Sequence, residues 1–177
     1  MTGRGEAIVL IGFMGAGKSS VGRLLADRTG LPLYDTDELV SQRFGLPITD
    51  IFARYGESAF RDAESDAVHS LPQERAIIVS GGGVVLREQN VERLRALGTI
   101  VHLSASEDTL LARLSRDNPR PLLQTPDPRQ TFSELLHARA LFYQDAADFV
   151  IDTSALTLEQ VAEAVLQKIA TVSAAAA

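Results

Sequence analysis

Short apolar runs alternate along the chain with longer stretches in which apolar and polar residues recur at helical spacing. The apolar runs are rich in Ile, Val and Leu, and most are followed by Gly, Asp or Ser, which is typical of buried strands that end in turns. They predict five strands, at Ala7–Ile11, Leu31–Tyr34, Ala76–Val79, Thr99–Leu103 and Phe149–Ile151.

Three of the intervening stretches predict amphipathic helices. Ser19–Arg28, Asp108–Arg116 and Thr157–Ile169 each carry Leu, Val or Ile on one face. Strands that are separated by helices usually pair in parallel and are covered on both sides. We therefore expect an α/β fold of three layers, in which a parallel five-stranded sheet has helices on both faces.

Three segments depart from this simple alternation. Residues 36–70 contain no strand pattern, and an insertion of this length commonly carries a substrate site. Residues 117–129 hold four prolines, which exclude regular helix, and we interpret them as a mobile surface loop that could act as a lid. The alanine-rich end, residues 172–177, is expected to form a frayed tail.

Composition narrows the class of protein further. A chain of 177 residues with 45% hydrophobic and 23% charged residues can bury one core, so we expect a single domain over residues 1–177. The absence of cysteine excludes disulfides, thiolate metal sites and a catalytic thiol. A net charge of -6 argues against nucleic acid as a partner, and no apolar run is long enough for a membrane span. These features predict a cytoplasmic protein.

The segment between the first predicted strand and helix carries the strongest chemical signal. Gly12–Ser19 fits the pattern G-x-x-x-x-G-K-[ST] and has the strand and helix flanks that a phosphate-binding loop requires. In such a loop, backbone N–H groups point at phosphate oxygens, Lys18 reaches the β- and γ-phosphates, and the Ser19 hydroxyl binds Mg²⁺. The sequence therefore predicts a nucleoside triphosphate site. The alternative is a glycine-rich turn with an exposed lysine.

Two carboxylates follow the second predicted strand. Ligands of open α/β sheets bind at the carboxyl ends of strands, which is where Asp35 and Asp37 lie. In an extended chain, residues two apart point to the same side. One carboxylate could then hold hydrated Mg²⁺ while the other faces an acceptor hydroxyl. The alternative is a solvated acidic turn that caps the next helix.

Arg61 is a candidate for binding a carboxylate. It lies in an amphipathic stretch that begins near Glu57, and its planar guanidinium suits a carboxylate partner. Glu64 follows three residues later, where it could hold the arginine side chain in one orientation. On its own, Arg61 fits a surface arginine better than a binding residue.

A glycine triplet and three further arginines complete the candidate set. Gly81–Gly83 follows the third predicted strand and would allow a ligand to approach the backbone closely. Arg113 and Arg120 border the proline-rich loop, and Arg139 lies on the helix after it. The alternatives are a loose turn for the glycines and a solvated basic face for the arginines.

Taken together and in this order, the motifs resemble the shikimate kinase family over nearly the whole chain. The motifs are Gly12–Ser19, Asp35–Asp37, Gly56-Glu57 with Phe60-Arg61, Gly81–Gly83, Arg120–Leu123, and Arg139 with Tyr143. The resemblance implies a P-loop NTPase-type fold with strand order 2-3-1-4-5. It also implies a monomer that transfers the γ-phosphoryl group of ATP, with Mg²⁺, to the 3-hydroxyl of shikimate.

The resemblance assigns catalytic roles to three residues. It implies that Asp37 meets the acceptor hydroxyls, where it is a candidate base that also orients the hydroxyl, and that Arg120 reaches the phosphates from the lid. Lys18 would neutralise charge on the transferred group. It further implies that Ser19 binds Mg²⁺ directly and that Asp35 does so through water.

The remaining implied site residues divide into nucleotide and acceptor groups. Arg113 would lie against adenine, while Arg61 and Arg139 would hold the shikimate carboxylate. The other nucleotide residues are Gly15, Ala16, Gly17 and Ser20, and the other acceptor residues are Phe52, Phe60, Glu64, Gly82 and Gly83.

Two alternative functions are open at this point. Another small-molecule kinase of similar build, such as a gluconate kinase, would also bind a carboxylate acceptor, although the paired aspartates and the glycine triplet argue against it. A noncatalytic sensor of the same fold could lose Lys18 or Asp37 without penalty, and this chain keeps both.

Overall fold

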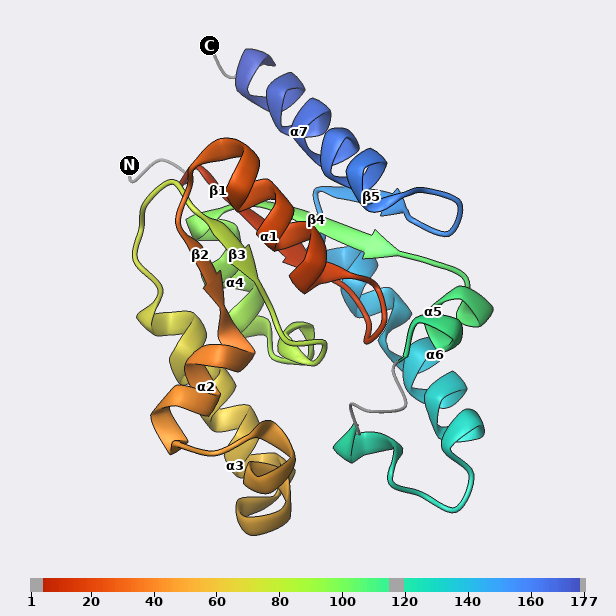
Figure 1. Ribbon diagram of the computed structural model, residues 1–177. Helices are drawn as coiled ribbons and strands as arrows, with labels where there is room; N and C mark the ends of the chain where they lie inside the picture. The colour runs from red at the N-terminus through yellow and green to blue at the C-terminus, as the bar shows by residue number, and fades with distance from the viewer. Residues whose placement is uncertain (1–4, 115–119, 176–177) are drawn as a thin grey trace.

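A five-stranded parallel sheet forms the centre of the molecule (Figure 1). The computed structural model describes residues 5–114 and 120–175. The strand order is β2-β3-β1-β4-β5, so the predicted fold class and order are confirmed. The strands are β1 (Ala7–Ile11), β2 (Leu33–Asp35), β3 (Ile77–Val79), β4 (Gly98–Ser104) and β5 (Phe149–Asp152), and each overlaps one predicted apolar run.

Burial on both faces explains the unbroken apolar sequence of the central strand. All five residues of β1 are buried, and Val9 lies opposite Ile78 of β3 on one side and Ile100 of β4 on the other. A strand covered on both faces needs no alternation of polar and apolar residues. At the sheet edge, β5 differs, because its Val150 is exposed while Ile151 is buried.

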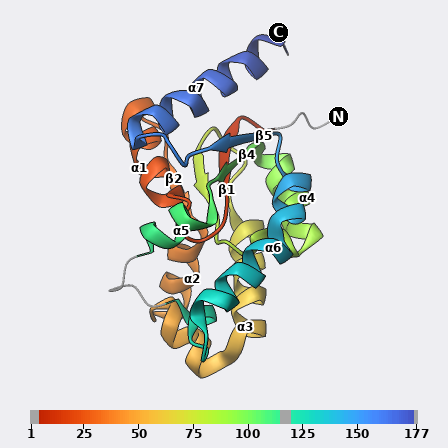
Figure 2. The same ribbon diagram turned by 90° about the vertical axis from the view of Figure 1, so that its right-hand side faces the viewer.

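Helices cover both faces of the sheet, as Figure 2 shows with the sheet seen nearly on edge. Helices α1 (Lys18–Thr29) and α7 (Leu158–Ala175) lie side by side on one face. Helices α4 (Glu88–Leu97) and α6 (Pro128–Ala146) cover the other. Within the described part of the chain, none of the helices combines the length and apolar character that crossing a membrane requires.

The expected substrate segment consists of two helices beyond the carboxyl ends of the strands. They are α2 (Thr36–Phe44) and α3 (Ile48–Ser70), which pack on each other around the buried residues Val40, Ile51 and Phe60. Helix α3 is broken at Gly56, whose φ of 81° and ψ of 172° are not helical. Glycine tolerates this conformation at no steric cost. The second half of α3 therefore begins at Glu57, as the sequence predicted.

The proline-rich segment is shorter than predicted. Its first residues, 117–119, lie outside the described residues, and Pro121–Leu123 forms a 3-10 turn, η2. Its last residues, Pro128 and Arg129, already belong to α6. Proline suits the first turn of a helix, where its missing N–H would have no partner, and the Asp127 side chain caps the helix by accepting from Gln130 N–H at 3.0 Å.

Two further helix ends differ from the prediction. Helix α7 continues to Ala175, so a frayed tail from residue 172 was wrong for 172–175, and alanine is the strongest helix former. Residues 176–177 lie outside the described residues. Helix α5 spans Glu107–Arg113, where a helix to Arg116 was predicted, and residues 115–116 also lie outside the described residues.

Candidate active site

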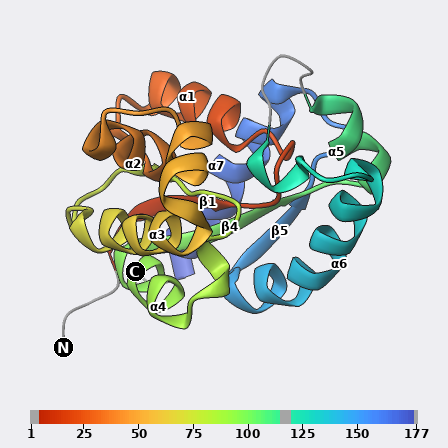
Figure 3. The same ribbon diagram turned by 90° about the horizontal axis from the view of Figure 1, so that it is seen from below.

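The site lies at the carboxyl ends of the strands, where the two halves of the fold face each other. Viewed from that side, α2 and α3 lie on one side of β1, and α5 and α6 lie on the other (Figure 3). The loop between β1 and α1 lies between them. This is the end of an open α/β sheet at which ligands bind.

The phosphate loop owes its shape to glycines at crowded positions. Gly15 and Gly17 have φ of 83° and 87°, in the left-handed region that favours glycine. A Cβ on Gly15 would lie 2.6 Å from the carbonyl oxygen of Leu110, and one on Gly12 would lie 2.5 Å from that of Leu103. The loop is therefore packed against β4 and α5, and its N–H groups with the start of α1 can receive an anion.

Lys18 lies folded against its own loop. Its Nζ donates to the carbonyl oxygens of Gly12 at 2.7 Å and Phe13 at 3.1 Å. Burial lowers the pKa of Lys18 to about 8, although the nearby charge of Asp37 raises it. At neutral pH the amine is still mostly protonated, and a bound phosphate would favour the charged form further.

Ser19 at the start of α1 and Asp35 at the end of β2 are hydrogen-bonded to each other. Ser19 Oγ donates to Asp35 Oδ2 at 3.3 Å, and Asp35 Oδ1 accepts the N–H of Asp37 at 2.9 Å. The predicted extended arrangement of Asp35 and Asp37 was wrong, because the strand ends at Asp35 and Asp37 lies in the first turn of α2. Asp35 therefore both caps α2 and faces the phosphate loop.

These two residues fit a Mg²⁺ ion that binds mainly to a nucleotide. A hydroxyl and a carboxylate are hard oxygen donors, and Mg²⁺ usually takes one or two protein ligands together with phosphates and water. Among the described residues, no group of three His, Cys, Asp or Glu side chains could form a protein-only metal site. The arrangement of Ser19 and Asp35 therefore matches an ion held by one or two protein ligands together with phosphates and water.

Asp37 shares a buried corner with Glu64. Asp37 Oδ1 and Glu64 Oε1 are both buried without a hydrogen-bond partner among the described residues. A Cβ on Gly81 would lie 2.7 Å from the first oxygen and 2.3 Å from the second, so only glycine leaves room for both. Burial, together with the charges of Glu64 and Asp35, raises the pKa of Asp37 to about 6.

Arg61 is fixed by two glutamates from its own helix. Its Nη1 donates to Glu64 Oε2 at 2.9 Å, and its Nη2 donates to Glu57 Oε1 at 3.2 Å. The side chain is only 10% exposed. A Cβ on Gly83 would lie 2.1 Å from Nη1, so the last glycine of the triplet is needed for the guanidinium to pack on the loop. The predicted pairing of Arg61 with Glu64 is present.

Arg139 reaches the same loop from α6. The buried Arg139 donates from Nη1 to the Gly82 carbonyl oxygen at 3.4 Å, and Tyr143 Oη donates to the same oxygen. The Arg139 guanidinium also lies 5.7 Å from the centre of the Phe13 ring. Two arginines from different helices therefore converge on one glycine loop.

Two cavities meet in this region. A cleft of about 710 Å³ runs along the phosphate loop, and a smaller pocket of about 90 Å³ lies beside it. The cleft is bordered by all eight predicted nucleotide residues, Gly15, Ala16, Gly17, Lys18, Ser19, Ser20, Arg113 and Arg120. The pocket is bordered by all eight predicted acceptor residues, Asp37, Phe52, Phe60, Arg61, Glu64, Gly82, Gly83 and Arg139. The residues shared by both are Met14, Asp37, Gly82 and Arg120.

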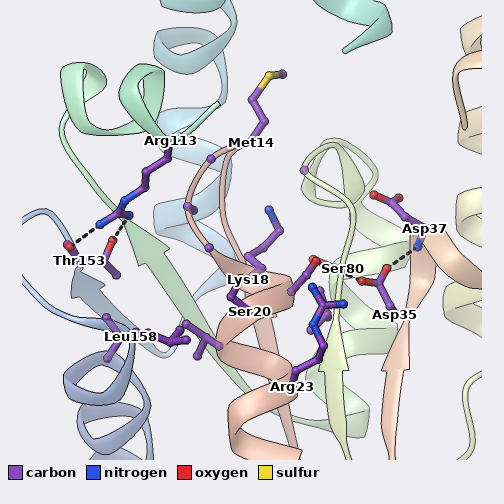
Figure 4. Close-up of a pocket in the computed structure, with 18 of the residues that line it drawn as sticks. Met14, Lys18, Ser20, Arg23, Asp35, Asp37, Ser80, Arg113, Thr153 and Leu158 are labelled. Atoms are coloured by element: carbon purple, nitrogen blue, oxygen red, sulfur yellow. Dashed lines mark hydrogen bonds between the residues drawn. The ribbon is translucent and has the colours of Figure 1, made fainter. Parts of the chain in front are cut away.

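The far end of the cleft contains contacts that the sequence did not reveal. Arg113 donates from Nη1 to Thr153 Oγ1 and from Nη2 to the Thr153 carbonyl oxygen, both at 2.8 Å (Figure 4). Leu158 and Val161 of α7 border the same end. In the pocket, Pro121 and Leu122 of η2 had also been missed as lining residues. Because Pro121 and Leu122 directly follow the predicted site residue Arg120, their place in the sequence could have identified them as lining residues.

The fold and the joined cavities define the protein as a P-loop kinase with a small acceptor. A sequence model of the shikimate kinase family matches residues 14–170. The chain therefore belongs to the shikimate kinase family, and it is an ATP-dependent kinase that uses Mg²⁺.

Individual relatives agree with this assignment. A shikimate kinase from Thermodesulfovibrio yellowstonii is 46% identical over 162 residues, which cover 91% of this chain and 93% of that protein. A shikimate kinase from Chromobacterium violaceum is 47% identical over 146 residues, which cover 82% of this chain and 79% of that protein. The solved structure of shikimate kinase from Acinetobacter baumannii in complex with shikimate superposes with a TM-score of 0.88 at 35% identity, covering 94% and 93%.

Proposed function

We propose that this protein phosphorylates shikimate at the junction of the two cavities, with Asp37 at the reacting hydroxyl. The 3-hydroxyl oxygen of shikimate forms a bond to the γ-phosphorus of ATP, and the bond from that phosphorus to the β–γ bridging oxygen breaks to release ADP. The hydroxyl proton passes to Asp37. The observation that carries this proposal is that Asp37 borders both the phosphate-loop cleft and the arginine-lined pocket.

The acceptor pocket suits a small carboxylate that bears hydroxyl groups. Arg61 and Arg139 hold the carboxylate, because two guanidinium groups can bind it by paired hydrogen bonds. Phe52 and Phe60 cover the ring, and their own rings lie 4.6 Å apart. The backbone of Gly82 and Gly83 contacts the acceptor, while Glu64 borders the pocket and keeps Arg61 oriented.

The residues around the nucleotide act mainly by neutralising phosphate charge and not by forming covalent bonds to the substrates. In phosphoryl transfer, catalysis is mainly positioning and electrostatic stabilisation. Lys18 and Arg120 stabilise charge on the transferred group, and the segment 120–127 acts as a lid that brings Arg120 over the phosphates. Ser19 and Asp35 would hold Mg²⁺, which when bound would screen phosphate charge. Arg113 lies against adenine.

We also propose that the protein works as a cytoplasmic monomer with neither nucleic acid nor membrane as a partner. The support for a monomer is membership of the shikimate kinase family, whose members are usually monomeric. The net charge of -6 disfavours a nucleic-acid partner.

An ADP-release assay with shikimate, gluconate, quinate or buffer alone tests the acceptor. We expect turnover with shikimate, and Lys18→Ala and Asp37→Asn should each lower it by about 10²-fold or more because charge stabilisation or proton acceptance is lost. Arg61→Lys should raise the KM for shikimate and leave that for ATP nearly unchanged. Arg43→Lys is the matched control, because Arg43 also pairs with a carboxylate, Asp66, but is exposed. Preference for gluconate, or full activity of Asp37→Asn, would refute the proposal.

A further inference from the structure

Arg87 makes three hydrogen bonds to the turn of α3 that carries Arg61. Its Nη1 donates to the carbonyl oxygen of Arg61 and to Ser65 Oγ, both at 3.1 Å. Its Nη2 donates to Asp62 Oδ1 at 2.7 Å. One guanidinium therefore binds three groups within one helical turn, which is a geometry that its planar, multi-donor head favours.

Arg87 also stands directly beyond the glycine loop. Gly83 is followed by a 3-10 turn, η1 (Val84–Leu86), in which Val84 and Val85 are buried, and Arg87 is then the N-cap residue of α4. The N–H of Leu86 donates to the carbonyl oxygen of Gly83 at 3.1 Å. The position of Arg87 is thus coupled through a short, ordered turn to the loop on which the Arg61 guanidinium packs.

The second half of α3 is placed by apolar packing and by polar links from outside the helix. The non-helical backbone at Gly56 separates it from the first half, and buried Phe60 and Val68 pack it into the core. The Arg61 guanidinium donates to Glu57 and Glu64, which lie on the same half and move with it. The bonds from Arg87 are a polar link from outside α3 at the turn that carries Arg61.

We propose that Arg87 is a positioning residue for the acceptor: its bonds to Arg61, Asp62 and Ser65 hold the Arg61 guanidinium at the working distance from the glycine loop. Arg87 is absent from both cavities' linings and acts through Arg61. The inference rests on the proposed function, because it assumes that Arg61 binds the acceptor carboxylate. A small displacement of a binding group can cost a large factor in productive binding.

Arg93 provides a matched control. It lies on α4, the helix that Arg87 precedes as N-cap residue, and its Nη2 also donates to a backbone carbonyl oxygen at the end of α3, that of the C-cap residue Leu71, at 2.6 Å. Leu71 is ten residues beyond Arg61, which corresponds to about 15 Å along a helix. Loss of either arginine removes a link between α4 and α3, but only Arg87 lies beside the acceptor arginine.

The test compares Arg87→Met with Arg93→Met in the full chain, by steady-state kinetics with both substrates varied and by thermal melting. Arg87→Met should raise the KM for shikimate by about 10-fold and change the KM for ATP less than about twofold. Arg93→Met should lower the melting temperature while leaving both KM values unchanged. Arg87→Lys should recover part of the loss, since an ammonium can still donate to the Arg61 carbonyl oxygen.

A second acceptor distinguishes a displaced Arg61 from a general loss of order in the acceptor pocket. Because Arg87 acts through the carboxylate contact, Arg87→Met should penalise shikimate more than its methyl ester. An unchanged KM for shikimate in Arg87→Met, an equal rise in Arg93→Met, or an equal penalty on acid and ester would each overturn the proposal.

Asp62→Asn covers the case in which Arg87→Met fails to fold. It weakens one exposed bond to Arg87 and should raise the KM for shikimate by about twofold. If this KM is normal in both Asp62→Asn and Arg87→Lys, the proposal fails. Failure of the proposed function would be distinct, because the wild-type protein would then not use shikimate at all.

Discussion

At the scale of single residues, burial moves two opposite charges of the site toward neutrality. The pKa of Lys18 falls to about 8 and that of Asp37 rises to about 6, in each case chiefly because burial disfavours the charged form. Asp37 also faces Glu64, and both present an oxygen without a partner among the described residues. The two buried carboxylates therefore disfavour the fold of the free protein, and a hydroxyl that donates to them on binding would relieve this cost.

Asp37→Asn should stabilise the protein while it abolishes turnover. The folded state raises the pKa of Asp37 from 3.8 to about 6, so stability falls as the pH rises from about 4 to about 6, and the full cost of the ionised carboxylate is present above pH 6. The amide removes this charge and can donate to Glu64, which should increase the unfolding free energy by about 1–2 kcal/mol at pH 7.5. Below about pH 4 the wild-type carboxyl is neutral in both states, and the gain should disappear.

Denaturant unfolding in Mg²⁺-free buffer at pH 7.5 and pH 4 measures this difference. Glu38→Gln is the control, because Glu38 is the exposed carboxylate next along the same helix and should give no gain. A destabilised Asp37→Asn at pH 7.5 would mean that attraction to Lys18 and Arg120 outweighs burial at Asp37.

At the scale of elements, function depends on how strands end and helices begin. The phosphate loop joins β1 to α1, Asp35 ends β2 and caps α2, and the glycine triplet follows β3. On the opposite side, η2 places Arg120 at both cavities and Pro121 and Leu122 at the acceptor pocket. One short turn thus borders both substrates, which is the arrangement that a lid requires.

Amides of residues 122–127 should exchange rapidly in the free protein and slowly when MgADP and shikimate are both bound. Most of this segment lies on the surface, and its backbone bonds include only short turns such as Leu123 N–H to the Arg120 carbonyl oxygen at 2.9 Å. Such segments open at low free energy. Hydrogen exchange with mass spectrometry tests this, with the buried strand β1 as the unchanging reference. Equal exchange in the free and ternary states would leave η2 as a passive connector.

At the scale of the whole molecule, strand order creates the site. Strand β1 lies between β3 and β4, and the chain continues from its end into α1. Helices α2 and α3 lie on one side of β1, and α5 and α6 lie on the other (Figure 3). The phosphate loop therefore lies between these two pairs of helices. Two separate binding sites then meet at Asp37.

The two sites should stabilise the molecule independently. Ligand at about 100 times its dissociation constant adds about 2.7 kcal/mol, which for a chain of this size raises the melting temperature by about 5–11 °C. Lys18→Ala should lose the shift with MgADP and keep that with shikimate, and Arg139→Lys should do the reverse. Chelation of Mg²⁺ should reduce only the ADP shift. Loss of both shifts in either variant would contradict separate sites.

The sequence by itself determined the features that are encoded within a short window. The apolar run of β1, the glycines and Lys18 of the phosphate loop, and the amphipathic α1 are contiguous, and their conformations follow from local sterics and periodicity. The five strands could be predicted for the same reason. The pairing of Arg61 with Glu64 was also accessible, because residues three apart meet on a helix.

Only the tertiary structure decided which distant residues meet. Asp37 and Glu64 share one corner because both lie on Gly81, and Arg113 reaches Thr153 forty positions away. Arg87 reaches Arg61 across two elements. Such contacts depend on strand order and on which helix faces pack together, and no local pattern records either. Asp35 is a local exception: the chain turns into a helix directly after it, so its relation to Asp37 follows from a cap, the alternative that the sequence had left open, and not from a strand.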